Sequence, residues 1–240
     1  YNHLFGISST FHHKSIDKTG FYRGINPSSL GGRLSSVISL ESKKNAEYSG
    51  VHGEFEMTPL NAGLYFESIK KDKSYFTLSA RRSWIDLLLP IEVRENSFNA
   101  NFYDVQLNFG FTTKKNDKID VSFLNTRDNY MLAALTSDTV NSSLFKITRR
   151  WYNILGSVKH TKEVNSRLTA RNSVHISHYH SLLGLSEQIL ANRVSLPDPY
   201  SELNQTRGIY DLMLWSDWDY EMDNTNHVNF GVQAINRLFL

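Results

Sequence analysis

Residues 101–112 read Asn-Phe-Tyr-Asp-Val-Gln-Leu-Asn-Phe-Gly-Phe-Thr, and an apolar side chain stands at every second position from 103 to 111. The apolar positions are Tyr103, Val105, Leu107, Phe109 and Phe111. The positions between them include Asp104, Gln106 and Asn108. Because successive side chains of a strand point to opposite faces of its sheet, this period of two predicts a β-strand with one apolar and one polar face.

The same alternation recurs along most of the chain from residue 48 onward. In residues 74–83, for example, Phe76 and Leu78 alternate with Thr77 and Ser79. Segments of this kind, separated by polar turns, predict an all-β fold with antiparallel strands. The nine predicted strands span residues 48–57, 60–69, 74–83, 100–113, 118–128, 145–159, 166–180, 208–220 and 226–239.

The predicted connections alternate in length. Residues 70–73, 114–117, 162–165 and 223–226 form short polar turns, whereas 84–99, 129–144 and 181–207 are long. Short turns at one end and long loops at the other are typical of a transmembrane barrel of the outer-membrane type. Aromatic side chains near the predicted strand ends suit the interfacial girdle of such a barrel. They are Tyr103, Trp151, Tyr152, Trp218 and Tyr220.

The composition excludes several other classes. The 240 residues carry 26 Lys+Arg and 24 Asp+Glu, a formal net charge of +2, so no nucleic-acid interface is predicted. The absence of cysteine excludes a disulfide framework and a thiolate metal site. No apolar run is long enough for a membrane-spanning helix, whereas alternating strands are compatible with the mean hydropathy of −0.40. The alternative is a soluble β-sandwich or small barrel, which would bury its apolar face.

Residues 1–45 differ from the rest, with more Gly, Ser and His and with strand-like stretches at 16–23 and 34–42. Three of their blocks are His-Leu-Phe-Gly at 3–6, Phe-Tyr-Arg-Gly at 21–24 and Gly-Gly-Arg-Leu-Ser-Ser-Val at 31–37. Two more blocks follow, Lys-Asp-Lys-Ser-Tyr-Phe at 71–76 and Ser-Ala-Arg-Arg-Ser-Trp-Ile-Asp at 79–86. Taken in this order, the blocks resemble the end of the plug and the first barrel strands of TonB-dependent outer-membrane receptors, notably those common in Bacteroidetes-type bacteria.

The resemblance implies a partial transmembrane antiparallel β-barrel, about nine strands of a larger barrel of roughly 22. Residues 1–45 would be the C-terminal part of the plug domain, and 46–240 the N-terminal strands of the barrel. The chain is then expected to be an internal piece of a longer protein. Contacts between plug and barrel are expected at Gly31, Gly32, Arg33, Ser35 and Ser36.

The function implied by the resemblance is capture of a scarce ligand at the bacterial outer membrane and its import into the periplasm by plug rearrangement. The implied partners are TonB with its ExbB/ExbD inner-membrane motor, outer-membrane lipid, a surface lipoprotein lid, and a small-molecule, glycan or peptide ligand. Two alternatives stay open. One is an outer-membrane adhesin or structural barrel that does not import, and the other is a soluble lectin-like β domain.

The candidate ligand-binding residues are aromatic, charged and histidine side chains of the plug remnant and the loops. They are His3, Phe5, His12, His13, Trp84, Asp86, Tyr130 and Tyr200. The sequence contains none of the phosphate-loop, dinucleotide, Gly-x-Ser-x-Gly or His-Glu-x-x-His signatures, so we expect no enzyme and no cofactor. Neither the pair His12–His13 nor His175, His178 and His180 offers three convergent ligands along one strand, and no metal site is predicted.

Overall fold

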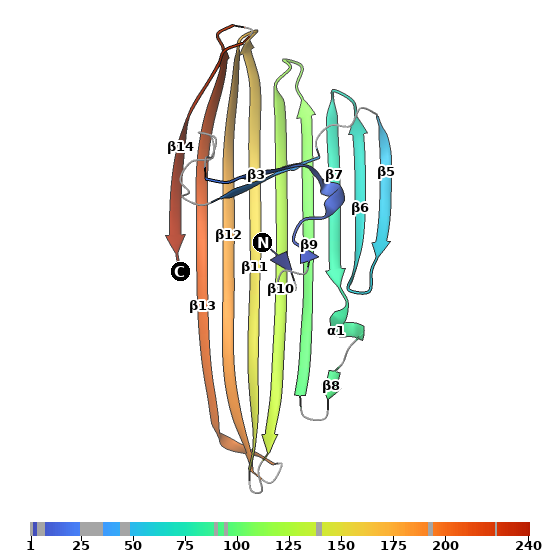
Figure 1. Cartoon of the computed structure of the whole chain (residues 1–240), viewed down its shortest axis with the longest axis vertical. Helices are drawn as coiled ribbons and strands as arrows, with labels where there is room; N and C mark the ends of the chain where they lie inside the picture. Colours follow the sequence, from blue (N-terminus) through green and yellow to red (C-terminus); the bar gives the residue numbers. More distant parts are fainter. Residues whose placement is uncertain are drawn as a thin grey trace.

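The computed structural model describes residues 2–3, 8–24, 36–43, 49–88, 91–93, 96–137, 141–191, 194–223 and 225–240. It is dominated by one antiparallel sheet whose strands follow one another in chain order (Figure 1). The nine strands of the continuous path are β5 (Gly50–Met57), β6 (Asn61–Lys70), β7 (Ser74–Ser83), β9 (Asn96–Thr112), β10 (Lys118–Ser137), β11 (Asn141–Asn165), β12 (Leu168–Ala191), β13 (Val194–Glu221) and β14 (His227–Phe239).

The remaining elements are short. Before the sheet come β1 (Asn2–His3) paired with β2 (Ser8–Ser9), the 3-10 turn η2 (His13–Ser15), and β3 (Ile16–Tyr22) paired with β4 (Val37–Ser42). Between β7 and β9 come the single-turn helix α1 (Ile85–Leu88) and β8 (Ile91–Val93), which pairs with β9. Among the described residues, no helix has the length and apolar character needed to span a membrane.

The predicted number and order of strands along the continuous path are confirmed, but two of the predicted long connections are wrong. Residues 129–144 belong largely to β10 and β11, which stay paired as far as Ser137 and Ser142. Residues 181–191 and 194–207 likewise belong to β12 and β13. The alternation of apolar side chains fades there, but a hydrogen-bonded backbone ladder does not require it. In residues 84–99, α1, β8 and the start of β9 replace a plain loop.

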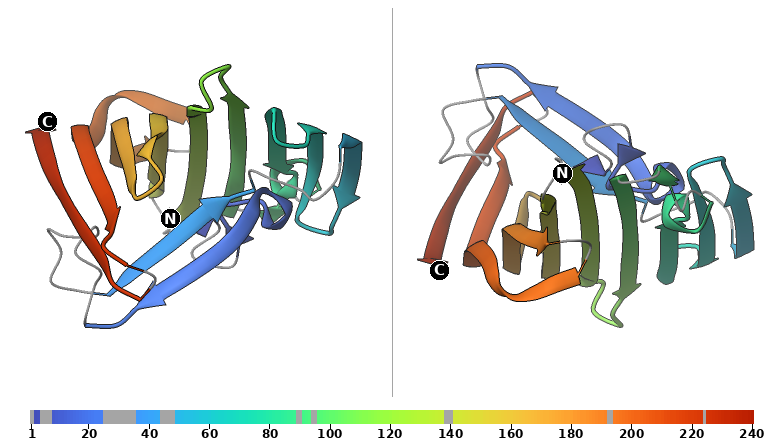
Figure 2. Two further views of the ribbon diagram at one scale, coloured as in Figure 1. Left: turned by 90° about the horizontal axis from the view of Figure 1, so that it is seen from above. Right: turned by 90° about the horizontal axis from the view of Figure 1, so that it is seen from below.

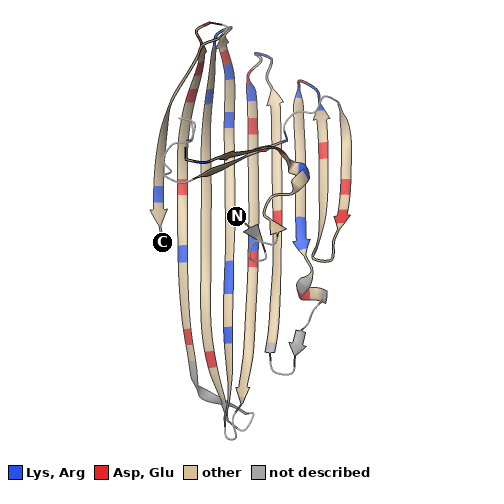
Figure 3. Cartoon of the chain, viewed as in Figure 1, with Lys and Arg blue, Asp and Glu red and all other residues tan. Residues whose placement is uncertain are grey.

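The short polar turns lie at one end of the sheet, as the sequence predicts. Figure 3 shows acidic and basic residues gathered at that end. One turn is displaced, because β11 runs to Asn165 and the chain reverses at residues 166–167 instead of 162–165. The longer strands also change the predicted girdle: Trp151 and Tyr152 stand in the middle of β11, whereas Trp218 and Tyr220 lie near the end of β13.

The sheet is curved, and β3 and β4 cross its hollow side (Figure 2). The polar positions of β9 face this side and are buried, with Asp104 and Asn108 each 1% exposed. The apolar positions face outward, where Phe109 is 44% and Phe111 is 37% exposed. The two faces predicted from residues 101–112 are therefore confirmed, and it is the polar face that the fold covers.

The outward face carries apolar side chains in continuous rows across neighbouring strands. One row follows directly from the pairing register and contains Phe76, Phe109, Val121, Val158, Val174 and Leu214. The last five of these side chains are all exposed. Large apolar patches on a protein surface mark sites that contact lipid or another molecule.

A close contact on the hollow side explains one glycine. Tyr75 of β7 lies across Gly110 of β9, and its hydroxyl donates a 2.7 Å hydrogen bond to Asp120 of β10. A Cβ atom at Gly110 would collide with the Tyr75 ring. Only glycine leaves room for a ring to lie flat against the backbone at this position.

Candidate functional site

The polar face of the sheet is covered by the N-terminal residues 2–3, 8–24 and 36–43, which we call the docked segment. Its contacts with the sheet are polar. Ser15 donates a 2.7 Å hydrogen bond to the Gln106 side chain, and Lys43 Nζ lies 2.9 Å from Glu67 Oε2. Polar contacts of this kind join the two surfaces, and this interface is the candidate functional site.

His3 is the most deeply buried contact of the docked segment, with a fully buried side chain. Its Nδ1 lies 2.8 Å from Asp128 Oδ2, and its Nε2 lies 3.3 Å from Asp104 Oδ2. The imidazole ring also stacks on Phe102, with ring centroids 4.2 Å apart. Burial lowers the pKa of His3, but hydrogen bonds to Asp104 and Asp128 outweigh it, so the pKa is raised above its ordinary value.

Asp104 is shared between His3 and Arg81. Arg81 of β7 stands directly opposite Asp104 of β9, and its Nη2 lies 2.9 Å from Oδ2. The same Nη2 donates a 2.7 Å hydrogen bond to the backbone carbonyl of Ser9. One carboxylate therefore organises an arginine of the sheet and a histidine of the docked segment, and the arginine in turn holds the docked backbone.

Tyr130 belongs to the same region, as part of a small core with Ala100 and Phe102. Its ring stacks on Trp151 at 5.0 Å between centroids, and its hydroxyl donates a 3.2 Å hydrogen bond to Asp128 Oδ1. Tyr130 is thus buried and supports the carboxylate that binds His3. It is not an exposed loop side chain, because β10 extends past it.

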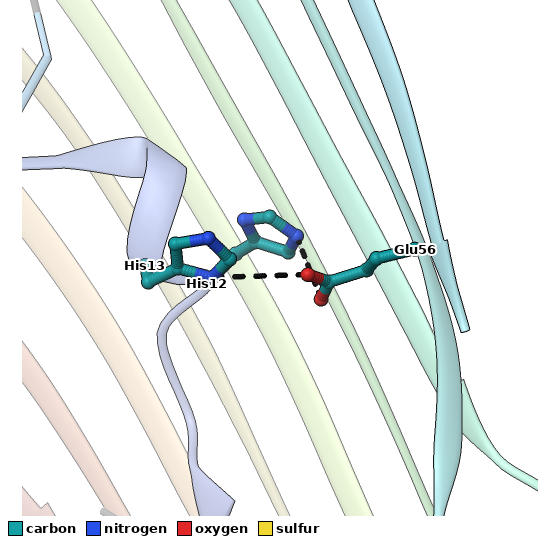
Figure 4. A group of neighbouring side chains, drawn as sticks. All are labelled: His12, His13 and Glu56. Atoms are coloured by element: carbon teal, nitrogen blue, oxygen red, sulfur yellow. Dashed lines mark ion pairs between the residues drawn. The ribbon is translucent and has the colours of Figure 1, made fainter. Parts of the chain in front are cut away.

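A second group of titratable side chains joins the docked segment to β5. His12 Nε2 lies 3.1 Å from Glu56 Oε1, and His13 Nδ1 lies 3.9 Å from Glu56 Oε2 (Figure 4). Burial lowers the pKa of His12, an effect that the Glu56 carboxylate only partly offsets. Of the described residues, these three form the group that could hold a metal ion.

The other predicted site residues are not brought to this interface or lie outside the described residues. Trp84 Nε1 donates a 3.1 Å hydrogen bond to the Pro59 carbonyl, and Asp86 of α1 pairs with Arg82 of β7 at 2.8 Å. Ser36 is exposed. Phe5, Gly31, Gly32, Arg33 and Ser35 lie outside the described residues, as does the side chain of Tyr200, so these predictions remain untested.

The sequence analysis missed the partners on the sheet, which are Glu56, Glu67, Arg81, Asp104 and Asp128. A signal for three of them was present. Glu56, Arg81 and Asp104 stand on the face opposite to the apolar positions of their strands, and a charge on the covered face of a sheet needs a partner. Glu67 and Asp128 share their face with apolar side chains such as Ile69 and Tyr130, so the pattern did not mark them. What the sequence could not supply was the identity of each partner, because it comes from a distant segment.

No protein-family model matches the chain, and no curated protein matches it. The geometry of the sheet and of the docked segment therefore has to support any function by itself.

Proposed function

We propose that this chain forms part of the barrel wall and part of the plug of a TonB-dependent outer-membrane receptor. Such a receptor binds a scarce ligand at the cell surface and imports it into the periplasm. The observation that carries the proposal is the inverted distribution of side chains. Charged and amide side chains such as Asp104 and Asn108 are buried, whereas the apolar row through Phe109, Val121 and Val158 is exposed.

This distribution favours a sheet that stands in lipid. A soluble β-sandwich gains its stability by burying the apolar face of each sheet. Here that face is open over several neighbouring strands, and exposing it to water would forfeit roughly 25 cal/mol for every Å² of apolar surface. Hydrocarbon around the sheet removes the cost, as it does for the outward face of membrane barrels.

The edges of the sheet also fit a place in a larger barrel. Within the described residues, β5 and β14 each pair with a strand on one side. Unpaired backbone groups in hydrocarbon cost several kcal/mol each, so a sheet in the membrane must close on itself. Closure would need further strands, which fits the larger barrel of roughly 22 strands implied by the resemblance.

The polar contacts of the docked segment suit a plug that has to move. Lys43–Glu67 is an example: the lysine is partly exposed and the carboxylate is buried, and water can hydrate both charged groups once the segment leaves the wall. In the proposal, TonB with ExbB/ExbD supplies the work that separates docked segment and wall. The ligand class stays a small molecule, glycan or peptide, with a surface lipoprotein as lid.

Two measurements on cells that produce the full-length protein test this proposal. The protein should stay in the outer-membrane pellet after alkaline carbonate extraction. Formaldehyde treatment of intact cells, followed by affinity purification, should yield a cross-linked species that contains TonB.

The two failures have different meanings. Extraction by carbonate would contradict the membrane wall and favour the soluble β domain. Firm insertion without any cross-link to TonB would contradict import and favour an adhesin or a structural barrel.

A further inference from the structure

His12, His13 and Glu56 bring three metal-ligating side chains together where the docked segment meets β5 (Figure 4). One ligand atom of each residue lies within 4.8 Å of the other two. The two histidines follow one another at the start of η2, whereas Glu56 stands on the hollow side of the sheet. The group therefore links two segments that are distant in the sequence.

His12 Nε2 is a buried nitrogen that lacks a hydrogen bond. The His12 side chain is 1% exposed, and its Nε2 makes no hydrogen bond of acceptable geometry even though Glu56 Oε1 is 3.1 Å away. An unsatisfied polar atom in a buried position costs free energy and calls for an explanation. Figure 4 shows the ring nitrogens of both histidines directed at the Glu56 carboxylate.

We propose that His12, His13 and Glu56 bind a divalent transition-metal ion, with Zn²⁺ as the best fit, and that this ion clamps the docked segment to β5. Two imidazoles and one carboxylate, with water as a fourth ligand, are an established donor set for zinc. Imidazole nitrogen also suits neighbouring metals such as Ni²⁺ and Cu²⁺. Mg²⁺ and Ca²⁺ prefer oxygen ligands and are poor matches.

The distances are compatible with a tetrahedral ion after small movements. Zinc lies about 2.0–2.2 Å from nitrogen and oxygen ligands, which places two tetrahedral ligand atoms about 3.4 Å apart. His12 Nε2 lies 3.1 Å from Glu56 Oε1 and His13 Nδ1 lies 3.9 Å from Oε2, and one ligand atom of each residue lies within 4.8 Å of the others, so the side chains must draw together around an ion. The His13 side chain stacks on His12 and is 63% exposed, so it borders solvent that can supply a water ligand.

One existing contact must open when the ion binds. His12 Nδ1 accepts a 3.2 Å hydrogen bond from the Lys14 backbone amide. A neutral imidazole that binds metal through Nε2 carries its proton on Nδ1, so the Lys14 amide has to turn away. The metal bond and the satisfied Nε2 compensate for this loss.

The proposal goes beyond import and does not depend on it, because it rests on the contact between the docked segment and β5. The sequence analysis predicted no metal site, since the third ligand comes from another element. A bound ion would hold the docked segment in place, and its removal would loosen that segment.

The test uses the purified full-length protein in detergent, freed of metal and titrated with Zn²⁺ against a chromogenic chelator. We expect one site that excess Ca²⁺ does not compete for. His13→Ala and Glu56→Gln should each weaken binding by at least about tenfold, the lower end of losses seen when residues behind metal ligands are changed. His13 is exposed, so His13→Ala leaves the buried packing intact.

His52→Ala is the matched control, because His52 stands on the same strand as Glu56 but outside the group. It should bind Zn²⁺ as the unaltered protein does. Limited proteolysis reads out the clamp: Zn²⁺ should slow cleavage of the docked segment in the unaltered protein and not in Glu56→Gln, and EDTA should reverse the protection. Zn²⁺ binding that survives both substitutions, or no binding at all, would overturn the proposal and leave His12–Glu56 as a simple ion pair.

Discussion

The strongest single test of the interface is the substitution Asp104→Asn, which keeps the shape of the side chain and removes its charge. Asp104 is 1% exposed and faces both Arg81 and His3, and the Arg81 side chain is only 8% exposed. Removing one partner of a buried ion pair costs about 3–5 kcal/mol, because the other charge stays buried without compensation. We expect a loss of that order in the free energy of unfolding.

The matched control is Asp86→Asn, which breaks an aspartate–arginine pair with a similar nitrogen–oxygen distance but a solvent-exposed arginine. Asp86 lies 2.8 Å from Arg82, whose side chain is 53% exposed. Solvent screens such a pair, so its loss should cost about 0–1 kcal/mol. Urea unfolding of the full-length protein in detergent, followed by tryptophan fluorescence, measures both values.

The same substitution should also release the docked segment. With Asp104 neutral, Arg81 loses the partner that holds it against the Ser9 carbonyl. Cleavage of the docked segment by a protease should become faster in Asp104→Asn and stay unchanged in Asp86→Asn. Equal effects of the two substitutions on unfolding and on cleavage would refute the reasoning that the buried polar interface holds the segment.

Four further predictions concern lipid, pH, packing and sidedness. Val158→Arg, on the outward face at 49% exposure, should cost roughly 2–4 kcal/mol in detergent or lipid, whereas Ser157→Arg on the opposite face should cost less; equal costs would contradict the lipid-facing assignment. Because the pKa of His3 is raised, its protonated form stabilises docking below about pH 6.5, and this contribution should be lost as the pH rises through the raised pKa. The rate at which a protease cleaves the docked segment should therefore increase with pH, and His3→Gln should abolish this pH dependence. Gly110→Ala should lower the free energy of unfolding in urea by about 1–3 kcal/mol, because the new methyl group collides with Tyr75. This cost should be smaller in a Tyr75→Ala background, and an equal cost in both backgrounds would contradict the explanation. In intact cells an impermeant thiol reagent should label Ser137→Cys and not Asn116→Cys, because the two residues lie at opposite ends of the sheet, and the reverse pattern would overturn the sidedness.

Much of the sheet could be predicted from the sequence, because the alternation of apolar and polar residues within each strand shows which side chains share a face. Residues 101–112 predicted which side chains of β9 share a face, and the register of the neighbouring strands agrees. Strand ends were harder to predict. In residues 129–137 and 181–191 the backbone ladder continues where the apolar alternation fades, so the pattern alone ended these strands too early.

Ligand binding by the candidate residues stays a prediction, and the structure shows only where their side chains lie. Histidines 3, 12 and 13 were singled out as candidates, and all three contact carboxylates of the sheet. Trp84 and Asp86 were singled out on the same grounds and lie elsewhere, next to α1 and within it. Residue type could not separate these cases, because a histidine or tryptophan has the same chemistry in a contact and in a loop.

By itself the sequence determined the all-β class, the number and order of the strands along the continuous path of the sheet, and which side chains of a strand share a face. These are local properties, since they follow from a period of two and from the turns between strands. Only the tertiary structure decided that the polar face is the covered one, and that Asp104 meets Arg81 and His3 while Glu56 meets His12 and His13. Those contacts join segments far apart in the sequence. Which residues meet depends on how the docked segment crosses the curved sheet, and no local sequence pattern contains that information.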